Sequence, residues 1–119
     1  MSTHVFWNLE CAVKEGQLDN VKALMAEMIE ATQTNEPGAL NYEWSISEDG
    51  QKLHLFERYA DSAAAVLHMS NFGAHFAGRF LAALDIKRFT VYGNPDEQAQ
   101  KVLGRAGAQF MSPLGGFSR

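Results

Sequence analysis

Two histidines, His68 and His75, lie seven positions apart in the segment "HMSNFGAHF", residues 68–76. An imidazole titrates near neutral pH, so either side chain could act as a general acid or base, or bind a metal. The spacing is not a recognised ligand pattern such as His-Glu-x-x-His, and Cys11 and His54 fall in predicted strands that do not converge with it. We therefore predict no metal site and no metal cofactor. His68 and His75 are either catalytic residues or polar residues at the rim of a pocket.

A β-hairpin is predicted around Asp49 and Gly50. The flanking segments, residues 39–47 and 51–60, alternate apolar and polar side chains. Asp-Gly between two such segments is typical of a two-residue type I′ turn. The pairs expected on the apolar face are Leu40 with Tyr59, Tyr42 with Glu57, Trp44 with Leu55 and Ile46 with Leu53.

Glu57 is the single carboxylate on that apolar face. Because burial of an unpaired carboxylate is costly, Glu57 should accept hydrogen bonds or have a raised pKa. It could act as a general base toward a phenol, or anchor a substrate hydroxyl. Alternatively it is a structural carboxylate, satisfied by a tyrosine hydroxyl or by Arg79.

Tyr42 and Trp44 share the face of Glu57 and could stack against a flat aromatic substrate. Aromatic residues at alternate strand positions are more often plain core. They form a binding site only if the helices stand off from the sheet. Phe72 and Arg79, on an expected helix, would then close the same pocket.

The remaining elements follow from apolar periodicity and from the residues that start or stop a helix. In the last expected strand, Phe89 and Val91 share one side and Ile86 lies on the other. Residues 70–73 are expected to separate two helices. The expected elements are a strand over 4–14, a helix over 17–32, short helices over 62–69 and 72–84, a strand over 85–93 and a last short helix from Pro95 to about Leu103.

This order predicts the α+β, ferredoxin-like split βαβ arrangement, a four-stranded antiparallel sheet with helices on one face. Residues 1–93 form that unit, and residues 94–119 are an appended short helix and tail of the same domain. The uncovered face of the sheet still carries Phe56, together with Phe6 or Trp7. We therefore predict a homodimer that covers this face, as in a dimeric α/β barrel.

Composition narrows the class of partner. With 119 residues the chain fits one domain, and a formal net charge of −4 argues against nucleic acid or an anionic membrane. No apolar run is long enough to span a bilayer, and the first residues lack a signal-peptide pattern. The lone Cys11 has no disulfide partner in the chain. A cytoplasmic location is the simplest expectation.

The segment "EPGALNYEW…LHLFERYADSAAAVLHMSNFGAHF" resembles the antibiotic biosynthesis monooxygenase (ABM) family, which includes quinol monooxygenases. The resemblance covers about residues 4–93. It rests on Glu-Pro-Gly before the second strand, Tyr42, the Glu57-Arg58-Tyr59 strand end, Asp61 at a helix start, and His68 followed by Ser70. The chain departs from the family in two places. The usual Ser-Pro-His-Phe segment becomes Ser70-Asn71-Phe72, with the histidine displaced to His75, and the tail beyond residue 93 is longer.

The resemblance implies a homodimeric monooxygenase that oxidises a phenolic or quinol-type aromatic molecule with molecular oxygen, without metal or flavin. In that scheme Glu57 or His75 ionises the phenol. Arg79 or His68 stabilises the resulting oxyanion. The aromatic side chains of Tyr42, Trp44 and Phe72 would exclude water and hold the ring.

Two other functions stay open. Haem-degrading monooxygenases of the same fold use an asparagine on the first strand and a histidine on the later helix. Asn8 and His75 fall in similar places, so Asn8 is included among the candidate substrate-binding residues, although Leu67 and His68 occupy the region where those enzymes have a tryptophan. The third possibility is a non-catalytic dimer that binds a small molecule.

Overall fold

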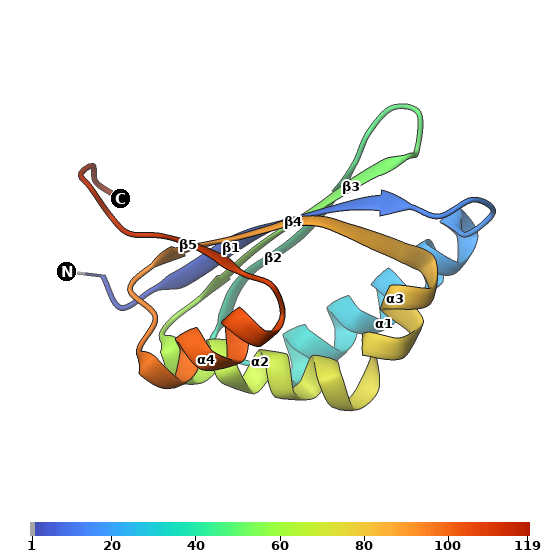
Figure 1. Ribbon diagram of the computed structural model, residues 1–119. Helices are drawn as coiled ribbons and strands as arrows, with labels where there is room; N and C mark the ends of the chain where they lie inside the picture. Colours follow the sequence, from blue (N-terminus) through green and yellow to red (C-terminus); the bar gives the residue numbers. More distant parts are fainter. Residues whose placement is uncertain (1) are drawn as a thin grey trace.

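The computed structural model describes residues 2–119, which form one sheet covered on one face by helices (Figure 1). The sheet has five strands in the order β2-β3-β1-β4-β5. The first four strands and their helices follow the ferredoxin-like order, which confirms the predicted fold class. The elements are β1 (Val5–Val13), α1 (Leu18–Asn35), β2 (Ala39–Ile46), β3 (Lys52–Tyr59), α2 (Ser62–His75), α3 (Ala77–Ala83), β4 (Leu84–Gly93), α4 (Glu97–Arg105) and β5 (Gln109–Met111).

The central strand β1 defines the two faces of the sheet. Side chains alternate along a strand, and here Val5 and Trp7 are buried under the helices while Phe6 and Asn8 lie on the opposite face. We call the helix-covered face the inner face and the other the outer face. β1 pairs antiparallel with both β3 and β4.

The β2–β3 register is confirmed from Asn41 to Ile46, including the pair of Tyr42 with Glu57. The expected pair of Leu40 with Tyr59 is wrong. A β-bulge between Ala39 and Asn41 places Ala39 opposite Tyr59 instead. The extra residue of the bulge leaves Leu40 exposed.

The hairpin turn also differs from the expected type I′ turn, which requires a positive φ at both central residues. Within residues 2–119 only glycines have a positive φ, and in this turn that residue is Gly50, with φ 74°. The Gly50 N–H donates to the Ser47 carbonyl at 2.9 Å. The Asp49 carboxylate accepts from the Ser47 hydroxyl and from the Gln51 N–H, and these bonds stabilise the longer loop.

The helix after β3 is longer than expected. α2 continues through residues 70–73, and the break between helices falls at Phe76. Gly73 costs a helix only about 1 kcal/mol, and no proline is present to stop it. The Asn71 side chain donates to Glu36 instead of competing for its own backbone.

A second irregularity moves Ile86 onto the inner face. The β1–β4 register shifts between Glu10 and Cys11, so that Cys11 lies opposite Ile86 and Leu9 opposite Phe89. Ile86 therefore shares the face of Phe89, and the expectation that these two residues lie on opposite sides is wrong. A regular period of two cannot anticipate a bulge.

The chain after β4 is also part of the packed structure. α4 lies against α2, and its Ala99 and Leu103 are buried in the core. β5 then adds a parallel strand beside β4, which the weak periodicity of the tail did not indicate. Beyond β5 the tail leaves the body of the protein (Figure 1). Leu114 and Phe117 in this tail are almost fully exposed. No helix in the described part of the chain is long and apolar enough to cross a membrane.

Candidate functional site

α2 carries His68 into the core. The Asp61 carboxylate starts the helix by accepting from the Ala64 N–H at 2.8 Å. Ala65 and His68 then lie three residues apart on the side that faces the sheet, and both are buried. His68 is only 5% exposed, so both ring nitrogens must find partners inside the protein.

Those partners are two carboxylates on opposite sides of the ring. His68 Nδ1 lies 3.0 Å from Glu36 Oε1, and His68 Nε2 lies 3.1 Å from Glu57 Oε1. The Tyr59 hydroxyl donates to the same Glu57 oxygen at 2.7 Å. Both carboxylates are at most 5% exposed. We call Glu36, Glu57, Tyr59 and His68 the buried cluster.

The electrostatics of the buried cluster favour a charged imidazole. Burial alone would lower the pKa of His68, but the hydrogen bonds with Glu36 and Glu57 outweigh it and raise the pKa from 6.5 to about 9. At neutral pH His68 is therefore an imidazolium that donates from both nitrogens. Burial, followed by the nearby Glu57 charge, raises the pKa of Tyr59 and of Tyr42, so both phenols stay protonated.

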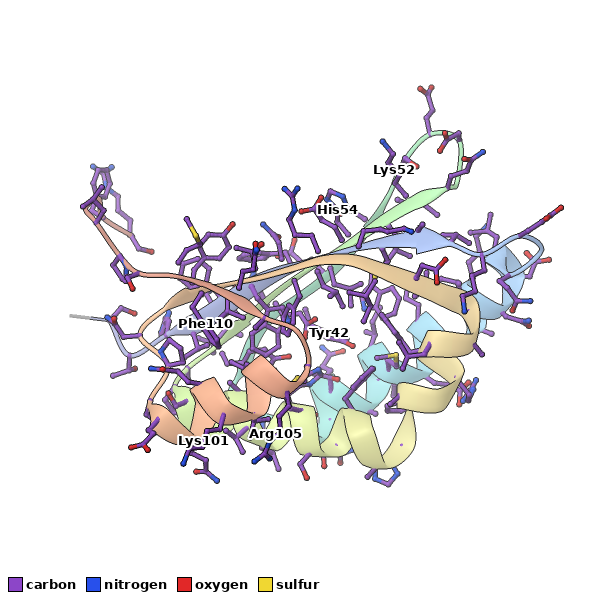
Figure 2. All side chains as sticks on the ribbon, in the orientation of Figure 1. Tyr42, Lys52, His54, Lys101, Arg105 and Phe110 are labelled. Carbon is purple, nitrogen blue, oxygen red and sulfur yellow. The ribbon has the colours of Figure 1, made fainter. Side chains whose placement is uncertain are left out.

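A small apolar cavity lies beside the cluster, between the sheet and the helices. Its volume is about 60 Å³, and Glu57 and His68 are the charged residues in its wall. Tyr42 lies on the helix side of the sheet (Figure 2) and lines this cavity. The cavity is lined by Trp7, Leu9, Met28, Tyr42, Leu55, Glu57, His68, Met69, Phe72, Phe80, Ile86, Phe89 and Ala106.

A larger groove, of about 500 Å³, runs along the outside of the helices between α1 and the α2–α3 region. Glu36, Asn71, His75 and Arg79 line it, along with apolar residues of both helices. Three residues line the cavity and the groove alike and so form the wall between them. These wall residues are Met28, His68 and Phe72.

The structure brings four of the sequence-predicted residues together at the cavity, which are Glu57, His68, Tyr42 and Phe72. Trp44 lies behind Tyr42, with its ring packed against Phe80 at a centroid distance of 6.2 Å, and does not line the cavity. The Tyr42 hydroxyl and the Trp44 indole N–H are buried without a hydrogen-bond partner among the described residues.

His75 and Arg79 lie in the groove instead of the cavity. His75 is exposed in the last turn of α2. Arg79 donates to Glu27 on α1, with Nη1 3.1 Å from Oε1, and therefore does not satisfy Glu57. Of the two partners suggested for Glu57, the tyrosine hydroxyl is the one that the structure shows, and it belongs to Tyr59.

Asn8 lies on the outer face, opposite Phe56 on β3 and Thr90 on β4. The sheet therefore separates Asn8 from the cavity and from His75, which lines the groove on the helix side. The asparagine–histidine arrangement of the haem-degrading enzymes does not form here. Asn8 and His75 therefore no longer support the haem-degrading alternative.

Glu36 is the functional candidate that sequence reasoning missed. It follows the last residue of α1 in the Glu-Pro-Gly segment, which contributes to the family resemblance but was not among the predicted site residues. Gly38 in this segment passes close to α2, where an added Cβ would lie 2.6 Å from the Ala64 Cβ. A carboxylate directly before Pro-Gly, at the point where the chain must cross to the next layer, was the available signal.

Among residues 2–119, no group of three or more histidine, cysteine or acidic side chains is arranged to hold a metal ion. Cys11 is buried, and burial raises the pKa of its thiol to about 12, so it stays a thiol at neutral pH.

The fold and the buried cluster together define a ferredoxin-like α+β protein with an acid–base unit between sheet and helices. The family model described as antibiotic biosynthesis monooxygenase matches residues 5–77, which is more than half of the chain. The chain belongs to this family, which is generally monooxygenase-like.

Solved structures of similar fold include MupZ from Pseudomonas fluorescens. MupZ is 27% identical, with a TM-score of 0.87 over 99% of this chain and 96% of that chain. Rv0793 from Mycobacterium tuberculosis is 26% identical, with a TM-score of 0.59 over 79% of this chain and 97% of its own. A conserved protein from Methanosarcina mazei, 19% identical, has a TM-score of 0.65 over 76% and 91% of the two chains and shares the fold. The likeness to MupZ thus extends through α4 and β5. No curated protein matches the chain.

Proposed function

We propose that the protein is a monooxygenase that oxidises a phenolic or quinol-type substrate with molecular oxygen, without a metal or flavin. The observation that carries the proposal is the position of His68 between two buried carboxylates at the wall of an apolar cavity. Such a unit can accept a proton at Glu57 and stabilise an oxyanion at the same time. Membership in the ABM family supports this type of chemistry.

The chemistry needs little beyond proton transfer. Glu57 takes the phenolic proton, and the electron-rich phenolate itself reduces oxygen. A ring C–H is replaced by C–O through a hydroperoxide, which loses water to leave a quinone. One oxygen atom thus ends in the quinone and the other in water, with all four electrons supplied by the substrate.

The cavity must enlarge to admit an aromatic ring. A cavity of about 150 Å³ holds one benzene molecule, whereas this one measures about 60 Å³. Met28 and Phe72 separate it from the groove, and both have rotatable side chains. We propose that the substrate approaches along the groove and displaces these two side chains to reach Glu57.

The functional unit is proposed to be a homodimer packed through the outer face. On that face Phe6 stacks on Tyr92 at a centroid distance of 5.4 Å and meets Phe56 edge-on at 6.4 Å. A partly exposed aromatic cluster at the centre of a sheet is typical of an interface. A second copy is the partner that the proposed dimeric barrel requires.

Oxygen uptake tests the proposal directly. Purified protein is mixed with a panel of hydroquinones and polycyclic phenols, with and without EDTA. Uptake above the autoxidation rate that survives chelation is the expected result. Uptake that EDTA abolishes would contradict the metal-free mechanism, and no uptake across the panel would contradict the monooxygenase function.

The small cavity favours one second candidate, a dimer that binds a small molecule without transforming it. In that case the same panel would produce binding by calorimetry but no oxygen consumption. Both functions predict that a small molecule occupies the cavity. Oxygen consumption therefore distinguishes the monooxygenase from the dimer that only binds.

A further inference from the structure

We propose that Glu36 and His68 form a proton exit, through which the His68 imidazole gives a proton to water in the open groove, or takes one from it, each time Glu57 in the closed cavity gains or loses one. The proposal assigns Glu36 a positioning and proton-accepting role for His68, beyond the acid–base role given to Glu57. Its kinetic part rests on the proposed function. Its structural part concerns the resting protein and is independent of the proposed function.

The two ends of the His68 ring face different compartments. Nε2 meets Glu57, which lines the cavity and not the groove. Nδ1 meets Glu36, which lines the groove and not the cavity. His68 lines both, so its imidazole is the polar residue of the wall that separates them.

The cavity wall offers few other groups that could pass a proton to water. The rest of the cavity wall is apolar, apart from the Tyr42 hydroxyl. The titratable groups packed around His68 are Glu36, Glu57, Tyr42 and Tyr59, and both phenols have a raised pKa. Neither tyrosine can release a proton near neutral pH. The path through Nδ1 and Glu36 is therefore the available one.

The proton balance needs no rotation of the ring. When Glu57 takes a proton from the substrate at its free oxygen, the Nδ1 proton of His68 passes to Glu36 and then to groove water. His68 becomes neutral, keeps its Nε2 proton and still donates to Glu57. When Glu57 later returns a proton to the departing water, Nδ1 is reprotonated from the groove. The total charge of the buried cluster is the same before and after each exchange.

Hydrogen exchange in the wild-type protein tests this arrangement without any substrate or variant. In ¹⁵N-histidine-labelled protein near pH 6, both N–H signals of the His68 imidazolium are followed by NMR with water saturation transfer. We expect Nδ1–H to exchange about tenfold faster or more than Nε2–H, because the cavity side exchanges only when the wall opens. Equal rates, or a faster Nε2–H, would overturn the exit.

Variants test whether Glu36 is the coupled group. Glu36→Gln should lower the NMR titration midpoint of His68 by about one to three pH units, because an opposite charge within contact distance is removed. Glu30→Gln is the matched control, since Glu30 is exposed on α1, the helix that Glu36 follows, and lines neither the cavity nor the groove. An unchanged midpoint in Glu36→Gln, or an equal drop in Glu30→Gln, would overturn the coupling.

Measurements of turnover test the kinetic part of the proposal. Glu36→Ala should lose kcat with little change in KM, and formate or acetate, which can enter the open groove, should restore kcat in proportion to its concentration, whereas chloride should not. A loss that no carboxylate restores, in a variant with a native circular dichroism spectrum, would mean that Glu36 is only structural. If no substrate is turned over, the proposed function is wrong. The hydrogen-exchange experiment still tests whether His68 and Glu36 form a proton exit, because it needs no substrate.

Discussion

His68 on α2 and Glu57 on β3 are joined across the layer boundary, with Nε2 3.1 Å from Oε1. The same Glu57 oxygen accepts the Tyr59 hydroxyl, and the opposite side of the imidazole meets Glu36. Each buried charge in this arrangement therefore has a partner, which is the condition for burying charge at acceptable cost. The contact ties a helix to the sheet and places a charged imidazole at the cavity.

Stability should fall as the pH rises through the titration of His68. Its pKa in the folded protein, about 9, lies above the ordinary 6.5, so the folded state binds more protons between these values. The contribution is complete below about pH 6.5 and is lost as the pH rises through about 9. A complete loss amounts to roughly 3 kcal/mol of unfolding free energy at 1.36 kcal/mol per pH unit.

Urea unfolding at pH 6, 7.5 and 9.5 measures this dependence. His68→Gln keeps a polar side chain that cannot titrate, so its stability should be lower at pH 6 and nearly level across the range. A wild-type protein as stable at pH 9.5 as at pH 6 would show that His68 is not held as an imidazolium.

Glu57→Gln should lower turnover far more than substrate binding. The amide keeps the shape and can still accept from Tyr59, but it cannot take a proton, so kcat should drop by about 10²–10⁴-fold. Steady-state oxygen uptake and calorimetric binding separate the two quantities. Glu48→Gln, an exposed change in the β2–β3 loop, is the matched control and should leave kcat in place. Equal turnover in Glu57→Gln would exclude the base role.

Two tyrosine-to-phenylalanine changes should differ in their effects on stability. Tyr59→Phe removes the donor to Glu57 and should cost about 1–3 kcal/mol of unfolding free energy. Tyr42→Phe removes a buried hydroxyl that has no partner among the described residues, so it should be neutral or stabilising. Urea titrations of both variants decide the point, and a larger loss for Tyr42→Phe would contradict the hydrogen-bond assignment.

Two glycine-to-alanine changes probe the path of the chain near Glu36. Gly38→Ala would place a Cβ 2.6 Å from the Ala64 Cβ and should destabilise by about 1–3 kcal/mol, since neither backbone can yield easily. Gly73→Ala, in α2 with open space around it, should stabilise by about 0.5–1 kcal/mol. Thermal unfolding measures both. A tolerated Gly38→Ala would place the Glu-Pro-Gly segment farther from α2.

The proposed homodimer should depend on the aromatic cluster of the outer face. Phe56→Glu would put a charge between Phe6 and its neighbours and should give a monomer by light scattering after gel filtration. Leu81→Ser is the control, because Leu81 is half-exposed on α3, on the helix side of the sheet. A Phe56→Glu dimer with wild-type affinity would exclude the outer face as the interface.

Much of the fold follows from local patterns in the sequence. Alternation in β1 and around the hairpin identified the strands and the pairing of Tyr42 with Glu57, because a period of two assigns each residue to a face. Several of the features that failed are those where one residue is inserted or where several turn geometries compete. The bulges near Ala39 and Cys11 and the loop at Gly50 are of this kind.

The sequence by itself placed Glu57 on an apolar face and identified His68 as a candidate for acid–base chemistry. Only the tertiary structure joined them, because their contact links a strand and a helix whose separation in space no local period encodes. The same holds for Glu36, which lies thirty-two residues from His68 along the chain and meets it at 3.0 Å. The packing of layers also placed His75 and Arg79 in the groove and Asn8 behind the sheet, since burial and long-range contacts decide which polar residues share a site.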